Sequence, residues 1–82
     1  MTLTELRYAV ALAETRHFGR AASACFISQP TLSIAVKRLE ATLAVTLFER
    51  GSSEVTLTEA GERLIPQARR VLAEAAALKA MA

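Results

Sequence analysis

The sequence contains no aspartate, and among its 82 residues it has a single histidine and a single cysteine. A side-chain nucleophile needs a base beside it for activation, and neither His17 nor Cys25 has a partner at a convincing spacing. We interpret His17 as a turn or surface histidine and Cys25 as a small thiol of the core. No zinc-binding cluster surrounds Cys25 either. The sequence therefore predicts a protein without catalytic residues, metal ions or cofactors, which is not an enzyme.

Glycine-rich loops and long apolar runs are missing as well. The three glycines are isolated from one another, so no loop resembles those that cradle phosphates. No apolar run approaches the ~20 residues of a transmembrane helix, and residues 1–5 lack the features of a signal peptide. We therefore expect one small cytoplasmic domain that does not enter a membrane.

Acidic residues are absent from one long stretch, between Glu14 and Glu40, although the whole chain has a net charge of only +2. The basic residues of that stretch are Arg16, Arg20, Lys37 and Arg38. A local basic surface of this kind suits a polyanion. A solvated face that balances the acidic residues elsewhere explains the charge pattern equally well.

Apolar residues at helical spacing predict a first helix over residues 3–16. Thr2 and Glu5 have the spacing of a capping box at its start. Residues 17–20 form a predicted break. The alanine-rich residues 21–25 that follow predict a short second helix, whose small side chains allow close approach to a neighbouring helix.

The third predicted helix, from about Gln29 to Leu43, carries the most informative pattern in the chain. Ser28 is the expected N-cap, and Pro30 suits the first turn, where its missing N–H is not needed. At about 100° per residue, one face is apolar and expected to be buried, and it consists of Leu32, Val36, Leu39 and Leu43. The opposite face is short-chained and then cationic, and it carries Pro30, Thr31, Ser33, Ile34, Lys37, Arg38 and Ala41.

Two short β-capable runs, residues 47–50 and 55–57, flank a Gly-Ser-Ser tip and predict a β-hairpin, or wing. An isolated hairpin is marginal in water. We therefore expect Phe48, Val55 and Leu57 to pack it against the helices.

A long final helix is predicted over residues 59–82, with Thr58 as its cap and a bend at Pro66. Its apolar residues recur close to heptad spacing and include Leu64, Ala68, Val71, Leu72, Ala75 and Leu78. The core of so small a domain cannot cover this apolar stripe. We therefore expect the stripe to join two copies of the chain. The predicted fold is mainly α: a winged helix-turn-helix domain over 1–57 with a β-hairpin wing, followed by a linker and dimerisation helix over 58–82.

A short helix, a tight turn and a second helix with a basic outer face are typical of a helix-turn-helix that binds double-stranded DNA. The residues expected to contact bases or the groove are Gln29, Pro30, Thr31, Ser33, Ile34 and Lys37. Those expected to contact the DNA backbone, directly or from the wing, are Ser28, Arg38, Arg50, Ser52 and Ser53. The alternative is a winged-helix module that binds another protein through the same surface.

Five motifs, together with the run from Leu6 to Ala13, resemble the N-terminal domain of LysR-type bacterial transcription regulators. They are residues 18–22 (Phe-Gly-Arg-Ala-Ala), 28–33 (Ser-Gln-Pro-Thr-Leu-Ser), 37–40 (Lys-Arg-Leu-Glu), 47–50 (Leu-Phe-Glu-Arg) and 57–61 (Leu-Thr-Glu-Ala-Gly). The segments at 16–18, 25–26 and 36–39 together resemble the peroxide-responsive OxyR-type branch of that family.

The resemblance implies a nucleoid-associated homodimer that joins through the final helix and reads an inverted repeat. It implies tetramers when an effector domain is present, and it adds Arg20 to the residues that face the DNA backbone. It also implies that peroxide-sensing cysteines belong to the effector domain, which this chain lacks, so Cys25 is not the sensor.

Overall fold

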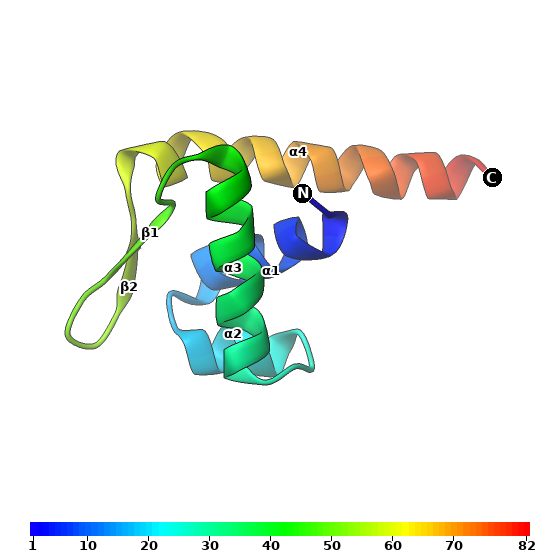
Figure 1. Cartoon of the computed structure of the whole chain (residues 1–82). Coiled ribbons are helices and arrows are strands. Elements are labelled where there is room, and N and C mark those ends of the chain that lie inside the picture. Colours follow the sequence, from blue (N-terminus) through cyan, green and yellow to red (C-terminus); the bar gives the residue numbers. More distant parts are fainter.

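Four helices and one hairpin make up the computed structural model, which describes all residues from 1 to 82. In chain order they are α1 (Leu3–Thr15), α2 (Phe18–Ala24), α3 (Gln29–Leu43), β1 (Phe48–Arg50), β2 (Val55–Leu57) and α4 (Glu59–Met81). Figure 1 shows the hairpin beside α3, and α4 running across one end of the fold and projecting away from it. This is the mainly helical winged helix-turn-helix architecture that the sequence predicts. None of the helices combines the length and the hydropathy needed to cross a membrane.

Helix α1 packs against α2, α3 and α4 and forms the centre of the core. The predicted capping box is present, since the Thr2 hydroxyl accepts from the Glu5 N–H and the Glu5 carboxylate accepts from the Thr2 N–H. The helix ends at Thr15, earlier than predicted, because Arg16 adopts a left-handed conformation with a φ of 55°. Its buried side chains are Leu6, Ala9, Val10, Leu12 and Ala13.

Helix α2 begins at Phe18, inside the segment predicted to be a break. His17 provides the reason, because its Nδ1 accepts a hydrogen bond from the Arg20 N–H at 3.1 Å and caps the helix. The predicted break is therefore wrong for residues 18–20. Cys25 is half-buried and is not the core thiol that the sequence suggested. It lies at the C-cap, where the chain leaves the helix and turns toward the surface.

Helix α3 has the predicted bounds, and Ser28 caps it as predicted, with its Oγ accepting from the Thr31 N–H at 3.3 Å. The predicted apolar face is the buried one. Leu32, Val36 and Leu39 are 0%, 3% and 1% exposed, and Leu43 is half-buried. This burial sets the rotation of the helix about its axis, so the polar and cationic face points outward.

The two strands form an antiparallel hairpin in which Phe48 lies opposite Leu57 and Arg50 lies opposite Val55. Phe48 and Val55 are buried in the common core, and Leu57 packs against it. These are the residues predicted to hold the hairpin on the helices. Because a two-stranded hairpin has little stability of its own, this packing is what keeps it in place.

Two further contacts hold the hairpin, one at its base and one beside its tip, and the sequence predicted neither. The Glu40 carboxylate of α3 accepts hydrogen bonds from the backbone N–H groups of Leu47 at 2.6 Å and Phe48 at 3.3 Å. On the other strand, the Val55 N–H donates to the Arg16 carbonyl at 3.0 Å. The hairpin is thus attached both to α3 and to the turn that follows α1.

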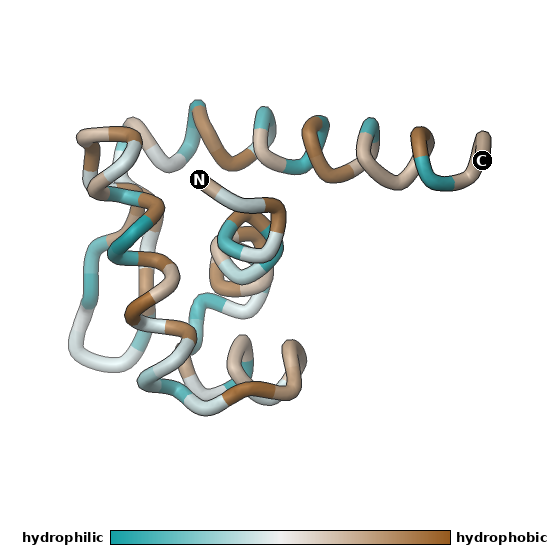
Figure 2. Tube along the Cα trace, turned by 45° about the vertical axis from the view of Figure 1, so that its right-hand side comes forward, coloured by the Kyte–Doolittle hydropathy of each residue, from teal (hydrophilic) through white to brown (hydrophobic).

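Helix α4 begins at its predicted cap, where the Thr58 hydroxyl accepts from the Gly61 N–H at 3.0 Å. Gly61 packs so closely on the hairpin that a Cβ there would collide with the Leu47 carbonyl oxygen. The helix passes through the exposed Pro66 as one element, and Ala68 is its last buried residue. Figure 2 shows hydrophobic residues recurring along α4 to its far end, well beyond the rest of the fold.

Candidate nucleic-acid interface

The outward face of α3 carries the side chains predicted to meet bases. The exposed ones are Gln29, Pro30, Thr31, Ile34 and Lys37, and Ser33 is half-buried. Ile34 is 53% exposed and lies among the polar and cationic side chains of this face. A helix face that surrounds an apolar side chain with polar and cationic ones suits a partner that carries both charged and apolar groups.

The start of α3 holds two hydroxyl groups in contact. Ser28 Oγ lies 2.9 Å from Thr31 Oγ1 and also accepts from the Thr31 N–H. One hydroxyl hydrogen serves the bond between them, which leaves the other free to donate outward. The helix dipole at this end favours an anionic group, although Pro30 has no N–H and the Thr31 N–H already bonds to Ser28. The pair is therefore suited to a phosphate or another acceptor.

A polar hollow separates the start of α3 from the tip of the hairpin. Four predicted site residues line it: Gln29, Arg50, Ser52 and Ser53. Arg16 and His17, from the turn before α2, line it as well. The Gln29 amide lies against α2, since a Cβ on Gly19 would lie 3.2 Å from Gln29 Nε2. Sequence reasoning missed Arg16 and His17 as site residues because nothing local indicates that the hairpin folds back over their turn.

A second hollow lies between α3 and β1, and it brings two predicted cations together. It is lined by Phe18, Ser33, Val36, Lys37, Glu40, Phe48 and Arg50. The Arg50 Cζ lies 4.2 Å from the centroid of the Phe18 ring, within the range of a cation–π contact. Glu40 also faces this hollow, but its carboxylate accepts the backbone N–H groups of β1 and the residue before it.

Arg38 and Arg20 lie apart from these two hollows. Arg38 follows Lys37 in the chain, but the helical rotation takes it to the other side of α3, where it lines a hollow together with Glu5. Arg20 is exposed on α2 and lines neither hollow beside the hairpin. The cations predicted to contact a DNA backbone are therefore spread over both sides of α3.

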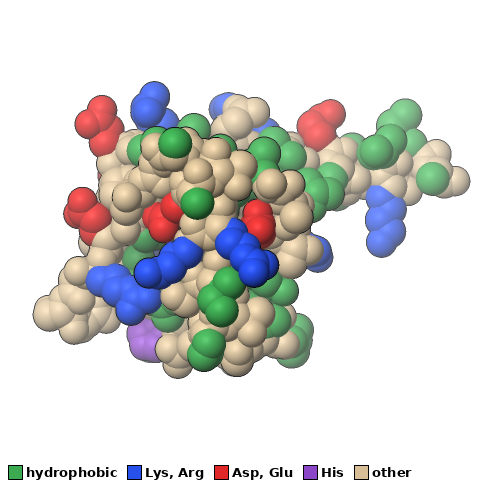
Figure 3. Space-filling view, in the orientation of Figure 1, with side chains coloured by type: hydrophobic (Ala, Val, Ile, Leu, Met, Phe, Trp, Pro, Cys, Tyr) green, Lys and Arg blue, Asp and Glu red, His purple; other side chains and the backbone are tan.

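Figure 3 shows basic side chains gathered in a band across this face, from the hairpin to α3 and beyond. Elsewhere in the chain, the arginines at 7 and 70 donate hydrogen bonds to Thr4 and Gln67 in their own helices. No group of three or more His, Cys, Asp or Glu side chains is placed to hold a metal ion. The chemistry of this face is that of a cationic surface with hydroxyl and amide donors, which suits a polyanion.

The apolar stripe of α4, predicted to join two copies, is divided by the fold. Ala68 is only 8% exposed and belongs to the core of the same chain. Leu64 and Leu72 pack against that core. Val71 and Leu78 are 37% and 72% exposed, and Ala75 is half-buried. Mainly the later part of the stripe is therefore available to a partner. Its first turns already pack against α1 and the hairpin.

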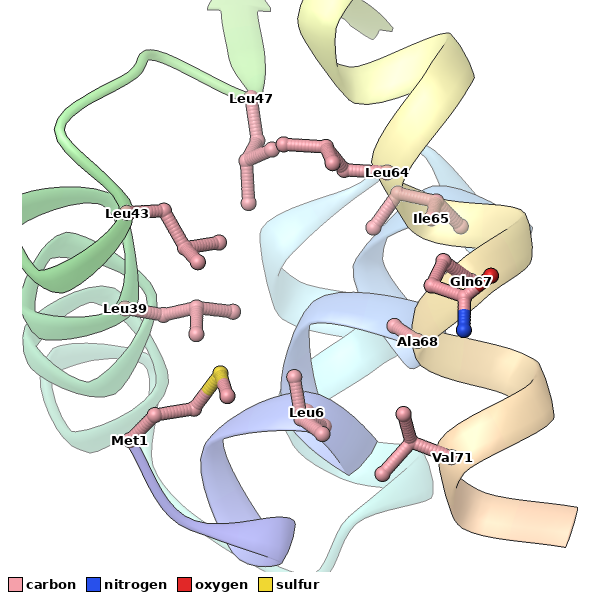
Figure 4. Close-up of a pocket in the computed structure, with 10 residues that line it drawn as sticks. All are labelled: Met1, Leu6, Leu39, Leu43, Leu47, Leu64, Ile65, Gln67, Ala68 and Val71. Carbon is pink, nitrogen blue, oxygen red and sulfur yellow. The ribbon is translucent and has the colours of Figure 1, made fainter. Parts of the chain in front are cut away.

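An apolar groove opens beside the first half of α4. Figure 4 shows its lining side chains pointing toward a common space between α3 and α4, which Met1 and Leu6 close from the side of α1. The space measures about 130 Å³, and all but one of its lining residues are hydrophobic: Met1, Leu6, Leu39, Leu43, Leu47, Leu64, Ile65, Gln67, Ala68 and Val71. Such a groove can accept a large apolar side chain.

Residues 3–62 match the family of bacterial regulatory helix-turn-helix proteins described as the lysR family. Over all 82 residues the chain is 54% identical to the "Hydrogen peroxide-inducible genes activator" of Escherichia coli O6:H1. It covers 27% of that protein, so it spans about a quarter of the length of the curated relative.

Two solved structures have the same fold. The full-length OxyR C199D of Pseudomonas aeruginosa is 54% identical, with a TM-score of 0.94 over 99% of this chain and 28% of that one. The domain in the CbnR_DBD–DNA complex is 34% identical, with a TM-score of 0.94 over 99% of this chain and 93% of that one. Both similarities extend over essentially every element, from α1 to α4.

Proposed function

The chain belongs to the LysR family of bacterial regulatory helix-turn-helix proteins, and on this premise we propose that it binds double-stranded DNA sequence-specifically for transcription regulation. The exposed, N-capped and basic face of α3 is the observation that carries the proposal. The major groove admits one α-helix, whose N-terminal residues meet the base edges. The similar domain that was solved in a complex with DNA supports this function.

Six residues of α3 take the groove contacts in this proposal: Gln29, Pro30, Thr31, Ser33, Ile34 and Lys37. The Gln29 amide has the donor and acceptor needed to bond an adenine edge twice. Ile34 has no hydrogen-bonding group, so its part in recognition is apolar contact, for example with a thymine methyl group. Sequence preference would then come from Gln29 and Ile34 more than from the charged residue Lys37.

The backbone contacts fall to Arg20, Ser28, Arg38, Arg50, Ser52 and Ser53. The hairpin lies over the adjacent backbone or minor groove, and its small polar tip, exposed from Gly51 to Glu54, permits close approach. Contacts of this kind set the register of a protein on the duplex and carry no sequence information themselves.

We propose that residues 1–57 form the DNA-binding domain and that the linker helix over 58–82 joins two copies. In an antiparallel or crossing pair of α4 helices, the exposed Leu78 of one copy would lie over the apolar groove of the other. Because the pair is two-fold symmetric, this contact would occur twice. The two α3 helices would then be related by the same axis and would match an inverted repeat in the DNA. Tetramers at full length belong to the same proposal.

The full-length protein is proposed to respond to peroxide in the cytoplasm, at the nucleoid. The support is the 54% identity to an activator of peroxide-inducible genes. Because this chain spans about a quarter of that relative, the sensing chemistry is assigned to an effector domain outside residues 1–82 and not to Cys25. Footprints of the full-length protein on its operator, with and without hydrogen peroxide, should differ, and identical footprints would contradict a peroxide response.

The decisive experiment on DNA binding selects bound duplexes from a random pool. We expect an inverted repeat with half-sites about 10 base pairs apart or at a multiple of that spacing. On the selected duplex, Lys37→Ala should make the slope of log affinity against log salt shallower by about 0.9, which is one phosphate contact. Lys79→Ala, at the far end of α4, is the matched control and should leave the slope unchanged.

Unchanged affinity and slope in Lys37→Ala would show that α3 does not face the groove as proposed. If no duplex is selected, and binding to a protein partner proceeds with little salt dependence, the same surface would be that of a winged-helix protein-interaction module.

A further inference from the structure

The ring of Phe18 lies beneath the guanidinium group of Arg50, with 4.2 Å between Cζ and the ring centroid. Phe18 is the first residue of α2, and Arg50 is the last residue of β1. The ring is half-buried against the core, so its position does not depend on the exposed Arg50 side chain. Arg50 is exposed, and the ring is the surface on which its cationic end rests.

This contact places Arg50 across a hollow from Lys37. Both cations line the space of about 190 Å³ between α3 and β1, and Ser33 adds a hydroxyl to the same wall. Glu40 lines the same hollow, but its carboxylate accepts hydrogen bonds from the backbone N–H groups of Leu47 and Phe48. Repulsion between the two cations is relieved most directly by a further anion between them. A phosphodiester group has the charge and the acceptor oxygens for this position.

Without the ring, Arg50 would be a long, mobile side chain on an exposed strand end. Restricting such a side chain on binding costs entropy, and a surface that restricts it beforehand improves affinity. The strand itself adds little rigidity, because every residue from Glu49 to Glu54 is exposed. The Phe18 ring therefore restricts the Arg50 side chain, which is a role beyond the packing of α2.

We propose that Phe18 is a positioning residue for DNA-backbone recognition: its ring holds Arg50 opposite Lys37, so that both cations contact the same phosphate. Phe18 does not touch DNA in this arrangement. The inference rests on the proposed function. It assigns a role to Phe18 and places a DNA phosphate in the hollow between α3 and β1.

The test compares Phe18→Leu, which keeps an apolar side chain but has no ring face, with Phe18→Tyr, which keeps the ring. On the selected duplex, Phe18→Leu should weaken binding about threefold to tenfold and make the salt slope shallower by up to about 0.9. Phe18→Tyr should bind like the unaltered chain. Thermal unfolding of each variant shows that the fold is retained at the binding temperature.

A double-variant cycle separates positioning from a general structural role. If the ring acts through Arg50, then Phe18→Leu combined with Arg50→Ala binds no more weakly than Arg50→Ala alone. Arg50→Lys, with Phe18 intact, provides a second measurement, because it keeps the charge and loses the planar stacking group. It should lose affinity with little further loss when Phe18→Leu is added.

Equal losses from Phe18→Leu with and without Arg50 would overturn the inference, as would an unchanged affinity and slope in Phe18→Leu. These outcomes leave the proposed function intact, provided that the unaltered chain selects a duplex. Failure of the unaltered chain to bind any duplex would instead overturn both.

Discussion

The outward face of α3 and the far half of α4 are both exposed, yet their side chains have opposite chemistry. The α3 face combines hydroxyl, amide and cationic groups on a helix whose other side is buried at Leu32, Val36 and Leu39. Beyond Ala68, α4 has no buried residue and still carries large apolar side chains such as Leu78. Exposure alone therefore says little about a partner. A rigid cationic face suits a polyanion, whereas an uncovered apolar stripe suits a second apolar surface.

The largest effect should come from Leu78→Glu, which tests whether the far half of α4 is a dimer contact. A two-fold pair buries two copies of this side chain, each worth about 1.5–3 kcal/mol. We expect the dimer dissociation constant to rise about a hundredfold or more, measured by sedimentation equilibrium. Ala73→Glu, on the opposite side of the helix, is the matched control and should leave assembly unchanged.

Leu78 is a sharper probe than Leu72, because Leu72 packs on the core of its own chain and its substitution would also damage the fold. A monomer at high micromolar concentration for the unaltered chain, with the domain still folded, would contradict the assembly proposal.

The next largest effect should come from Gly61→Ala, at the joint between the two regions. The added Cβ collides with the Leu47 carbonyl oxygen, which also accepts a hydrogen bond from the Thr58 N–H at 3.0 Å. We expect a loss of about 2 kcal/mol in the free energy of unfolding, in spite of the better helix propensity of alanine. Urea unfolding at fixed protein concentration measures it.

Gly19→Ala is the control for this loss. The three atoms nearest to its Cβ would be side-chain atoms of His17 and Gln29, at 3.0–3.3 Å, and these can shift. A loss at Gly61 no greater than that at Gly19 would show that α4 is not seated on the hairpin as described.

An effect of similar size, but selective for the DNA sequence, is expected from Gln29→Ala. Losing a bidentate contact to an adenine should weaken binding to the selected duplex by about 1–3 kcal/mol and leave binding to random DNA nearly unchanged. Fluorescence anisotropy on both duplexes measures the difference. Arg38→Ala should instead weaken both duplexes equally, because a phosphate contact carries no sequence information. Equal losses in Gln29→Ala would mean that this residue only positions the domain.

The smallest effect is expected from Ser28→Ala, which removes the cap of α3. The stability loss should be about 1 kcal/mol, seen as a lower urea midpoint with an unchanged slope. Thr42→Ala, whose hydroxyl bonds only to the Arg38 carbonyl one turn earlier, should lose less. Dimerisation through α4 should be the same in both variants, because the cap of α3 and the far half of α4 are independent of each other.

Much of the fold was predictable because its signals are local. The caps at Thr2, Ser28 and Thr58 each join groups three residues apart, and the bounds of α3 follow from its cap and its apolar period. The start of α2 was missed because histidine is not among the usual N-cap residues. The predicted break was therefore placed over a turn of helix that His17 in fact caps.

The candidate site was predictable only in part. The outward direction of α3 follows from the burial of its opposite face, so the exposure of Pro30, Ile34 and Lys37 could be expected. The separation of Arg38 from Lys37 into hollows on different sides needed the positions of α1 and β1. Likewise, Ala68 fits the heptad stripe by spacing, but α1 lies against it, which puts it in the core.

By itself, the sequence determined the three longer helices, their caps at Thr2, Ser28 and Thr58, the buried face of α3 and the motifs of the family, because each of these depends on residues within a few positions of one another. Only the tertiary structure decided that Phe18 carries Arg50, that Glu40 binds the start of β1, and that Met1 closes a groove on α4. These neighbours come from separate elements, and their distances are set by how the hairpin and α4 dock on α1. Docking depends on the shape of the whole core, and no periodicity along the chain encodes it.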